Sequence, residues 1–216
     1  SSIYTELTLA TTTTQGSLTL MKALPTQQRA LAKRNALISA AERCFAKLGY
    51  EGCTAKIVAE HAEVATGTFY QYFDNKDDML HTLAEQWFFE LEHTLDDHQS
   101  SPPTTDIEAR LENSLRFIYD FHEQKPELHQ IFEHRRNVDG TLAGILNRGE
   151  AKLQQHVVQF VHALKLPNAD LVAYNLFAMA EGVVHRHVFH SETKQDKDAV
   201  IQQAARMLAS YLHHPS

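Results

Sequence analysis

The sequence predicts an all-α protein of about nine helices. From residue 26 almost to the end, apolar residues recur at intervals of three and four, the spacing of one helical face. Residues that begin or end helices stand at the edges of these segments, among them Gly49, Thr54, Asn75 and Pro126. No segment alternates polar and apolar residues for long enough to indicate a strand, apart from LTLATTTT near the start.

The composition is that of an ordinary globular protein. The chain has 216 residues, of which 43% are apolar and 22% charged, enough for one large domain or two small ones. No apolar run approaches the roughly 18 residues of a membrane span, and no secretion signal opens the chain. We therefore expect a cytoplasmic protein with no membrane partner. Cys44 and Cys53 are too few for a disulfide framework or a set of metal ligands, and we expect both to be buried as small apolar residues.

Pattern and composition divide the chain into three parts. Residues 1–24 are rich in Thr and Ser and nearly uncharged, so we expect a disordered or extended arm. Residues 25–75 should form a domain of three helices, and residues 76–216 a helical bundle.

The first three helices are short or moderate in length. Apolar residues from Leu37 to Leu48 mark one face of the first, and Gly49 is a suitable C-terminal stop. Thr54 is a good N-cap for a second helix that ends near Ala62. A third helix is expected over residues 66–72.

Longer helices follow. Asn75 should cap a fourth helix, with Asp77 and Asp78 in its first turn, where the helix dipole favours acidic residues. The helical periodicity of this segment ends before SSPPTT, the clearest linker in the chain. Further helices are expected at residues 105–124, 126–136, 140–165, 168–190 and 196–213.

The second and third helices are joined by three residues and preceded by a longer amphipathic helix. That arrangement predicts a helix-turn-helix, in which the later helix enters the major groove of DNA. The charge distribution agrees with this. Residues 22–76 carry eight basic and five acidic residues, a balance of +3, whereas the whole chain has a net charge of -7. A basic segment in an acidic chain suggests contact with a polyanion.

The residues of the third helix suit contact with DNA. Gly67 would let the backbone approach closely, and Thr66 and Thr68 can donate to phosphate or touch a thymine methyl group. Gln71 can pair with adenine, and the tyrosines on either side of it can donate to phosphate oxygens.

The stretch CTAKIVAEHAEVATGTFYQYFDNKDDML resembles the DNA-binding signature of the TetR family of transcriptional regulators, and the match covers roughly residues 34–84. The resemblance implies core roles for Ile57, Ala59, Ala62, Val64, Phe69 and Phe73. It implies contacts with double-stranded DNA for Thr54, Lys56, Thr66, Gly67, Thr68, Tyr70, Gln71, Tyr72 and Lys76, the last through phosphate.

Two residues depart from the family's pattern. Glu63 stands where the family usually has a turn glycine, and Ala65 where it often has a capping serine. A left-handed glutamate and a lost cap each cost on the order of 1 kcal/mol. Glu63 would also place a negative charge near the DNA backbone.

A palindromic operator needs two recognition helices about 34–36 Å apart, so the resemblance implies a homodimer. Apolar stripes on the last two helices suit a four-helix interface between subunits, although packing within one chain gives the same pattern. The predicted interface residues are Val172, Leu176, Met179, Val183, Ala204, Leu208 and Tyr211.

The middle helices are rich in aromatic residues. In the TetR family, a pocket among such helices receives a small, often hydrophobic effector. The residues predicted to line it are Trp87, Phe88, Phe117, Phe121, Phe132, Tyr174 and Phe177.

No cofactor or metal site is predicted. In HRHVFH, His187 and His190 are neighbours on the helical wheel while His185 points elsewhere, so only a pair is available locally. Arg135 and Arg136 could clamp an anion, but a solvated helix C-terminus is the expected role.

These observations favour a dimeric, ligand-responsive repressor that binds a palindromic operator. A helical enzyme is not expected, because the chain contains no G-x-S-x-G, H-E-x-x-H or supported Cys-His pair. A helical interaction module that has lost DNA binding remains an alternative, motivated by Glu63 and the acidic total charge.

Overall fold

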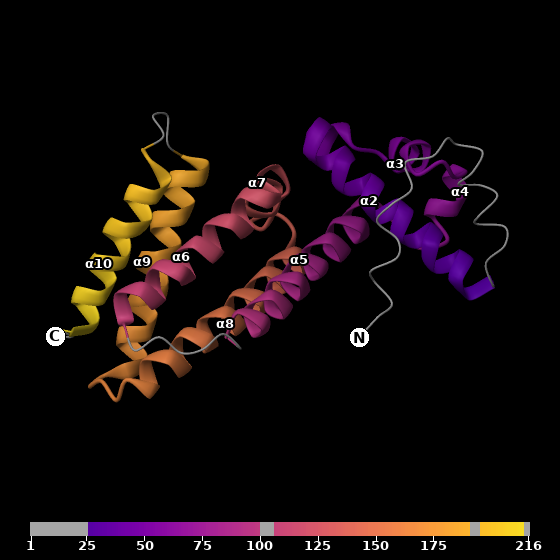
Figure 1. Cartoon of the computed structure of the whole chain (residues 1–216). Coiled ribbons are helices and arrows are strands. Elements are labelled where there is room, and N and C mark those ends of the chain that lie inside the picture. Colours follow the sequence, from indigo (N-terminus) through magenta and orange to yellow (C-terminus); the bar gives the residue numbers. More distant parts are fainter. Residues whose placement is uncertain (1–25, 100–105, 191–194, 214–216) are drawn as a thin grey trace.

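The computed structural model describes residues 26–99, 106–190 and 195–213, and this part of the chain is all helical (Figure 1). The predicted all-α fold is confirmed, while the arm at residues 1–24 with its LTLATTTT segment lies outside the described residues. The helices are α2 (Thr26–Gly52), α3 (Ala55–His61), α4 (Thr66–Phe69), α5 (Lys76–Gln99), α6 (Ile107–Gln124), α7 (Pro126–Arg135), α8 (Gly140–Ala163), α9 (Ala169–Phe189) and α10 (Lys197–His213).

The predicted caps form as expected. The Thr54 hydroxyl accepts a hydrogen bond from the backbone N–H of Ile57 at 3.3 Å, and the side-chain oxygen of Asn75 accepts one from Asp78 at 3.0 Å. Gly49 differs slightly from expectation, because it kinks α2 in a left-handed conformation (φ 67°) instead of ending it. The helix continues to Gly52.

The turn between α3 and α4 contains Glu63 in the left-handed region, with φ 55°. Its backbone N–H donates to the carbonyl of Glu60 at 3.1 Å, and the next N–H, of Val64, donates to Ala59 at 3.0 Å. The turn therefore keeps the conformation that a glycine adopts most easily, and the glutamate is held there by the surrounding hydrogen bonds.

Cys44 and Cys53 correct one expectation. Both are buried, as predicted, but they are joined in a disulfide and are not free thiols. The kink at Gly49 turns the chain back, so that the two Cα atoms lie 5.6 Å apart although the cysteines are nine positions apart in the sequence. The bond links α2 to the short connection before α3.

The core of the helix-turn-helix continues into the second half of the chain. Residues from α2 to α5 pack together with residues of α7 and α8 in a single buried cluster. Among them are Phe45, Phe69, Leu80, Phe132 and Leu146. Helix α5 runs through this shared cluster. Its first turns contribute Met79 and Leu83, its later turns contribute Trp87 and Leu91, and it therefore connects the two halves of the chain.

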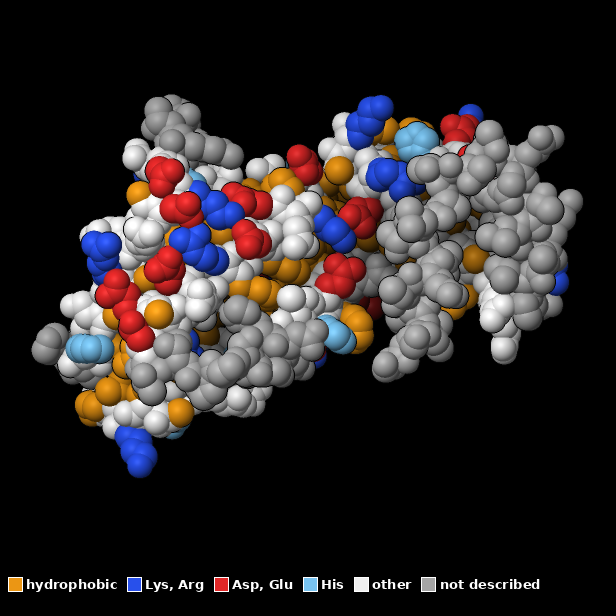
Figure 2. Space-filling view, in the orientation of Figure 1, with side chains coloured by type: hydrophobic (Ala, Val, Ile, Leu, Met, Phe, Trp, Pro, Cys, Tyr) orange, Lys and Arg blue, Asp and Glu red, His pale blue; other side chains and the backbone are white. Residues whose placement is uncertain are grey.

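A second core lies among α6, α8, α9 and α10, at the end of the molecule opposite to α3 and α4 (Figure 1). Its outer surface over α6 and α10 carries interspersed acidic and basic side chains (Figure 2). Lys197 joins these two helices through Asp120 at 2.8 Å and Glu123 at 2.7 Å. Exposed pairs of this kind each contribute little to stability.

Candidate DNA-binding surface and effector cavity

The predicted DNA contacts lie mainly on the open surface of the helix-turn-helix. Phe69 and Phe73 are buried and anchor α4, while Tyr70 is 59% exposed. Thr68 and Tyr72 are half-buried. The exposed residues of the predicted set are Thr54, Lys56, Thr66, Gly67, Tyr70 and Gln71.

Gly67 is not required by the fold. A Cβ atom placed on it would meet no atom within 4 Å, and its φ does not lie in the left-handed region. A glycine in a helix lowers stability by roughly 0.5–1 kcal/mol relative to alanine. The open space beside Gly67 is what the predicted close approach of a DNA backbone would need.

Lys76 makes internal contacts that the sequence did not predict. Its ammonium group donates to the carbonyl of Tyr50 at 3.0 Å and lies 4.0 Å from the centroid of the Tyr50 ring. Lys76 thereby satisfies a carbonyl in the last turn of α2, where helical carbonyls lack intrahelical partners. An ammonium has three donors, so a phosphate contact would use those not given to Tyr50.

Tyr50 also contacts the second half of the chain. The guanidinium carbon of Arg135, at the end of α7, lies 4.0 Å from the same ring centroid, and Arg135 pairs with Asp77 at 3.6 Å. The Tyr50 hydroxyl donates to Asp77, and burial together with this hydrogen bond raises the pKa of Tyr50 to about 12. The expectation of a solvated arginine is therefore wrong for Arg135.

Arg136 also makes ion pairs within the chain. Its guanidinium pairs with Glu133 at 3.2 Å and Glu150 at 2.8 Å and donates to Asn147 at 3.0 Å. Arg136 joins α7 to α8, so it is not a solvated end either.

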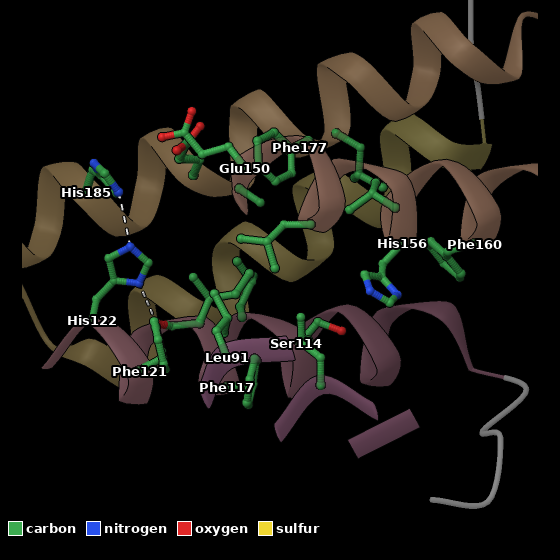
Figure 3. Close-up of a pocket in the computed structure, with 18 of the residues that line it drawn as sticks. Leu91, Ser114, Phe117, Phe121, His122, Glu150, His156, Phe160, Phe177 and His185 are labelled. Atoms are coloured by element: carbon green, nitrogen blue, oxygen red, sulfur yellow. Dashed lines mark hydrogen bonds between the residues drawn. The ribbon is translucent and has the colours of Figure 1, made fainter. Parts of the chain in front are cut away.

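A cavity of about 740 Å³ lies among α5, α6, α7, α8 and α9 (Figure 3). Its walls are mostly apolar, and its volume lies within the range of small-molecule sites. The structure places six of the seven predicted aromatic residues in its lining, namely Trp87, Phe88, Phe117, Phe121, Phe132 and Phe177. Tyr174 is the exception: it is 59% exposed and lies outside the cavity.

Acidic residues of three helices add polar groups to the lining. Glu133, Glu150 and Glu181 come from α7, α8 and α9. Burial raises the pKa of Glu150 and of Glu181 above the usual range, and for Glu181 the neighbouring Glu150 adds to the rise. The cavity is therefore amphipathic, and the sequence analysis identified only its apolar part.

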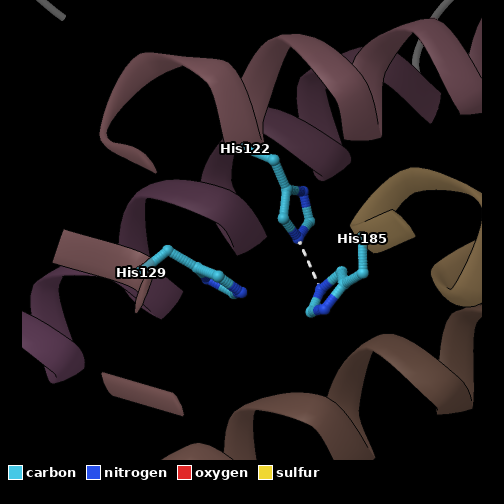
Figure 4. A group of neighbouring side chains, drawn as sticks. All are labelled: His122, His129 and His185. Atoms are coloured by element: carbon cyan, nitrogen blue, oxygen red, sulfur yellow. Dashed lines mark hydrogen bonds between the residues drawn. The ribbon is translucent and has the colours of Figure 1, made fainter. Parts of the chain in front are cut away.

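Three histidines line the same cavity, one each from α6, α7 and α9, and their rings converge (Figure 4). They are His122, His129 and His185, and each offers one ring nitrogen within 4.8 Å of the other two. The sequence analysis set His185 apart from the local pair of His187 and His190, and the structure instead brings it together with His122 and His129. His129 and His122 lie 56 and 63 residues before His185 in the sequence.

Most of the predicted dimer residues face inward. Val172, Leu176, Ala204 and Leu208 are buried in the second core of their own chain. Met179, Val183 and Tyr211 are half-buried, and the Tyr211 hydroxyl accepts a hydrogen bond from Asn175 at 2.9 Å. The interface prediction therefore chose the wrong face for at least these four residues.

Of the helices that the structure describes, none is long and apolar enough to cross a membrane.

The architecture defines a helix-turn-helix protein with a ligand-sized cavity in an all-helical second half. Comparison with known proteins identifies the family. Residues 37–83 match the sequence model of "Bacterial regulatory proteins, tetR family", and residues 106–212 match "Tetracyclin repressor-like, C-terminal domain". Together the two segments cover well over half of the chain, and the protein belongs to the TetR family of transcriptional regulators.

Individual relatives agree with this assignment. The HTH-type transcriptional regulator HbdR of Aromatoleum sp. (strain CIB) is 38% identical over 71 residues, 33% of this chain and 28% of HbdR. The uncharacterized HTH-type transcriptional regulator YhgD of Bacillus subtilis (strain 168) is 24% identical over 111 residues, 51% of this chain and 56% of YhgD. The match thus spans about a quarter of the first relative and about half of the second.

Solved structures share the fold. A TetR-family transcriptional regulator candidate from Mesorhizobium loti superimposes with a TM-score of 0.73 at 16% identity, covering 86% of this chain and 97% of that one. The fatty acid degradation regulator FadR from Bacillus halodurans gives a TM-score of 0.67 at 22% identity, covering 84% and 97%.

Proposed function

We propose that this protein is a cytoplasmic, ligand-responsive repressor that binds a palindromic operator as a homodimer. A small effector with an apolar body and a polar end would enter the cavity and release the DNA. One observation carries the proposal: α7 both lines the cavity, through His129, Phe132 and Glu133, and contacts the helix-turn-helix, through Arg135. A ligand that moves α7 would therefore act directly on the DNA-binding half.

Residues on the outer faces of α9 and α10 support the homodimer. Leu171, Tyr174 and Met207 are 58%, 59% and 48% exposed. Ala178 and Gly182 continue the line of Leu171 and Tyr174 along α9, because they follow at intervals of four. An exposed apolar line with small residues lets a second helix pack closely, so we assign this face to the second copy of the chain.

The release mechanism requires differential binding. Two recognition helices fit one operator only when their spacing matches successive turns of DNA. An effector that binds more tightly to a dimer with another spacing shifts the population away from the DNA-bound form, and a few kcal/mol of preference is sufficient.

The test is salt-dependent binding of the purified protein to DNA from around its own coding region. Tyr70→Ala should weaken binding, because it removes an exposed side chain of the recognition helix. Phe89→Ala is a matched control, since Phe89 is an exposed aromatic residue of α5 outside the helix-turn-helix. A wild-type protein with no salt-sensitive DNA preference would overturn the proposal and favour a helical interaction module instead.

A further inference from the structure

We propose that His122, His129 and His185 form a binding site for a divalent first-row transition-metal ion, with Zn²⁺ as the best-fitting ion. Imidazole nitrogen is a preferred ligand for such ions, and three convergent histidines are sufficient to hold one. The metal site itself does not depend on the proposed DNA-binding function; its use in the effector response rests on that function.

The spacing of the nitrogens fits one ion. The Nε2 atoms of His122 and His185 lie 3.1 Å apart. Nitrogens bound tetrahedrally to zinc at about 2.0–2.1 Å lie roughly 3.3 Å from each other. The pair is therefore already at ligand spacing. Since the nitrogens of the group lie within 4.8 Å of one another, His129 needs a shift of at most about 1.5 Å, which a small ring rotation provides.

A backbone carbonyl orients His122 for ligation. Its Nδ1 lies 2.8 Å from the carbonyl oxygen of Ile118, so Nδ1 carries the proton and Nε2 presents its lone pair to the cluster. Without an ion, the Nε2–H of His185 donates to that lone pair. With an ion, His185 would carry its proton on Nδ1 and turn its own Nε2 lone pair to the metal.

His129 is the member that most needs a partner. It is only 9% exposed, and neither ring nitrogen has a hydrogen-bond partner among the described residues. Its ring is stacked on Phe189 with centroids 4.9 Å apart.

The surroundings suit a cation with one open coordination position. Glu133, Glu150 and Glu181 line the same cavity, and Arg136, which is not in the lining, pairs with the first two. Three protein ligands leave the fourth tetrahedral position to water or to a ligand in the cavity, as in zinc sites that act on small molecules. The effector class that fits has an apolar body and a terminal metal-binding group, such as a carboxylate or a thiolate.

The experiment uses the full chain without a polyhistidine tag, freed of metal with a chelator and titrated with Co²⁺ and then Zn²⁺. We expect one ion per chain and the visible absorption of four-coordinate Co²⁺, which Zn²⁺ then abolishes. His129→Phe and His185→Phe should each lower the affinity at least about tenfold, because even the loss of a group that only orients a ligand has an effect of that size.

The variants separate a metal site from general histidine binding. Phenylalanine at position 129 keeps the stack on Phe189 and removes two buried unpaired nitrogens, so that variant should fold. His156→Phe is the matched control, because His156 lines the same cavity away from the cluster (Figure 3). No stoichiometric uptake by the wild-type chain, unchanged affinity in both cluster variants, or equal loss in His156→Phe would each overturn the proposal. DNA binding by the same metal-free sample tests the proposed function separately.

Discussion

The Arg135 guanidinium lies over the ring of Tyr50, with 4.0 Å between its central carbon and the ring centroid. This contact joins the end of α7 to the last turns of α2, and Lys76 of α5 lies at the same distance from that ring. Six residues before Arg135, the same helix places His129 in the cavity. A displacement of α7 at the cavity therefore has a short physical route to the DNA-binding half.

Arg135→Ala should lower the free energy of unfolding by about 1–2 kcal/mol, because it removes a partly buried cation–ring contact and an ion pair. The same variant should bind DNA without effector but respond less to the effector. A double-mutant cycle with Tyr50→Leu, measured by urea unfolding, should give a coupling of about 0.5–2 kcal/mol. Strict additivity of the two substitutions would show that the contact carries no energy.

Gly67→Ala should separate folding from DNA binding. The new methyl group meets no atom of the protein, so we expect the variant to be up to about 1 kcal/mol more stable. DNA affinity should fall, because the methyl group occupies the space beside the recognition helix. Gly140→Ala is the control: its methyl group is equally unhindered at the start of α8, and it should leave DNA affinity unchanged. Undiminished DNA binding by Gly67→Ala would show that Gly67 does not lie at the DNA interface.

Glu63→Gly should raise both stability and DNA affinity. A glutamate in the left-handed conformation observed at position 63 costs roughly 1–2 kcal/mol, and a glycine does not incur this cost. Part of the gain is offset, because glycine loses more conformational entropy than glutamate when the chain folds. Glu63→Ala keeps the strained conformation and removes only the charge. We therefore expect higher DNA affinity in both variants and higher thermal stability in the glycine variant alone. Equal melting temperatures for the two would show that the turn is unstrained.

Glu181→Gln should change how stability depends on pH. Burial raises the pKa of Glu181 above its ordinary value of 4.5, so the folded chain holds this proton at pH values where the unfolded chain has released it. Stability is lost as pH rises from the ordinary to the raised pKa. The glutamine variant should match the wild type at pH 4 and be more stable at pH 7, as measured by urea unfolding. Glu127→Gln, at an exposed position on α7, serves as the control.

If the proposed homodimer forms through the exposed apolar line on α9, Tyr174→Glu should convert it into a monomer, because it places a charge within that line. Light scattering after gel filtration would measure the mass, and Phe89→Glu provides an equally drastic surface change elsewhere. A Tyr174→Glu protein that remains dimeric would place the interface on another face.

The sequence was sufficient for the helices but not for the contacts between them. Helical periodicity and the Thr54 cap are local properties, so they were predicted correctly. Helix α9 is apolar around much of its circumference, so its pattern did not reveal that Val172 and Leu176 face the core while Leu171 and Tyr174 face outward.

The polar part of the cavity could not be found in this way, because its residues come from several helices. His122 follows the cavity-lining residues Ile118 and Phe121 along one face of α6, and that position was a signal of burial. Nothing in the sequence around it indicated that His129 and His185 would meet it. Arg136 was misplaced for the same reason, since its partners Glu150 and Asn147 lie on α8.

The continuous core between the helix-turn-helix and α7–α8 limits how this protein can be recombined with its relatives. Phe132 and Leu146 pack in one core with residues of α2 and α5. A helix-turn-helix domain taken from another regulator would therefore not pack well against α7 and α8 of this chain. A working hybrid would need compensating changes along α7 and α8. We expect operator preference to be changed more simply at the exposed surface of α4, where side chains can be exchanged without disturbing that packing.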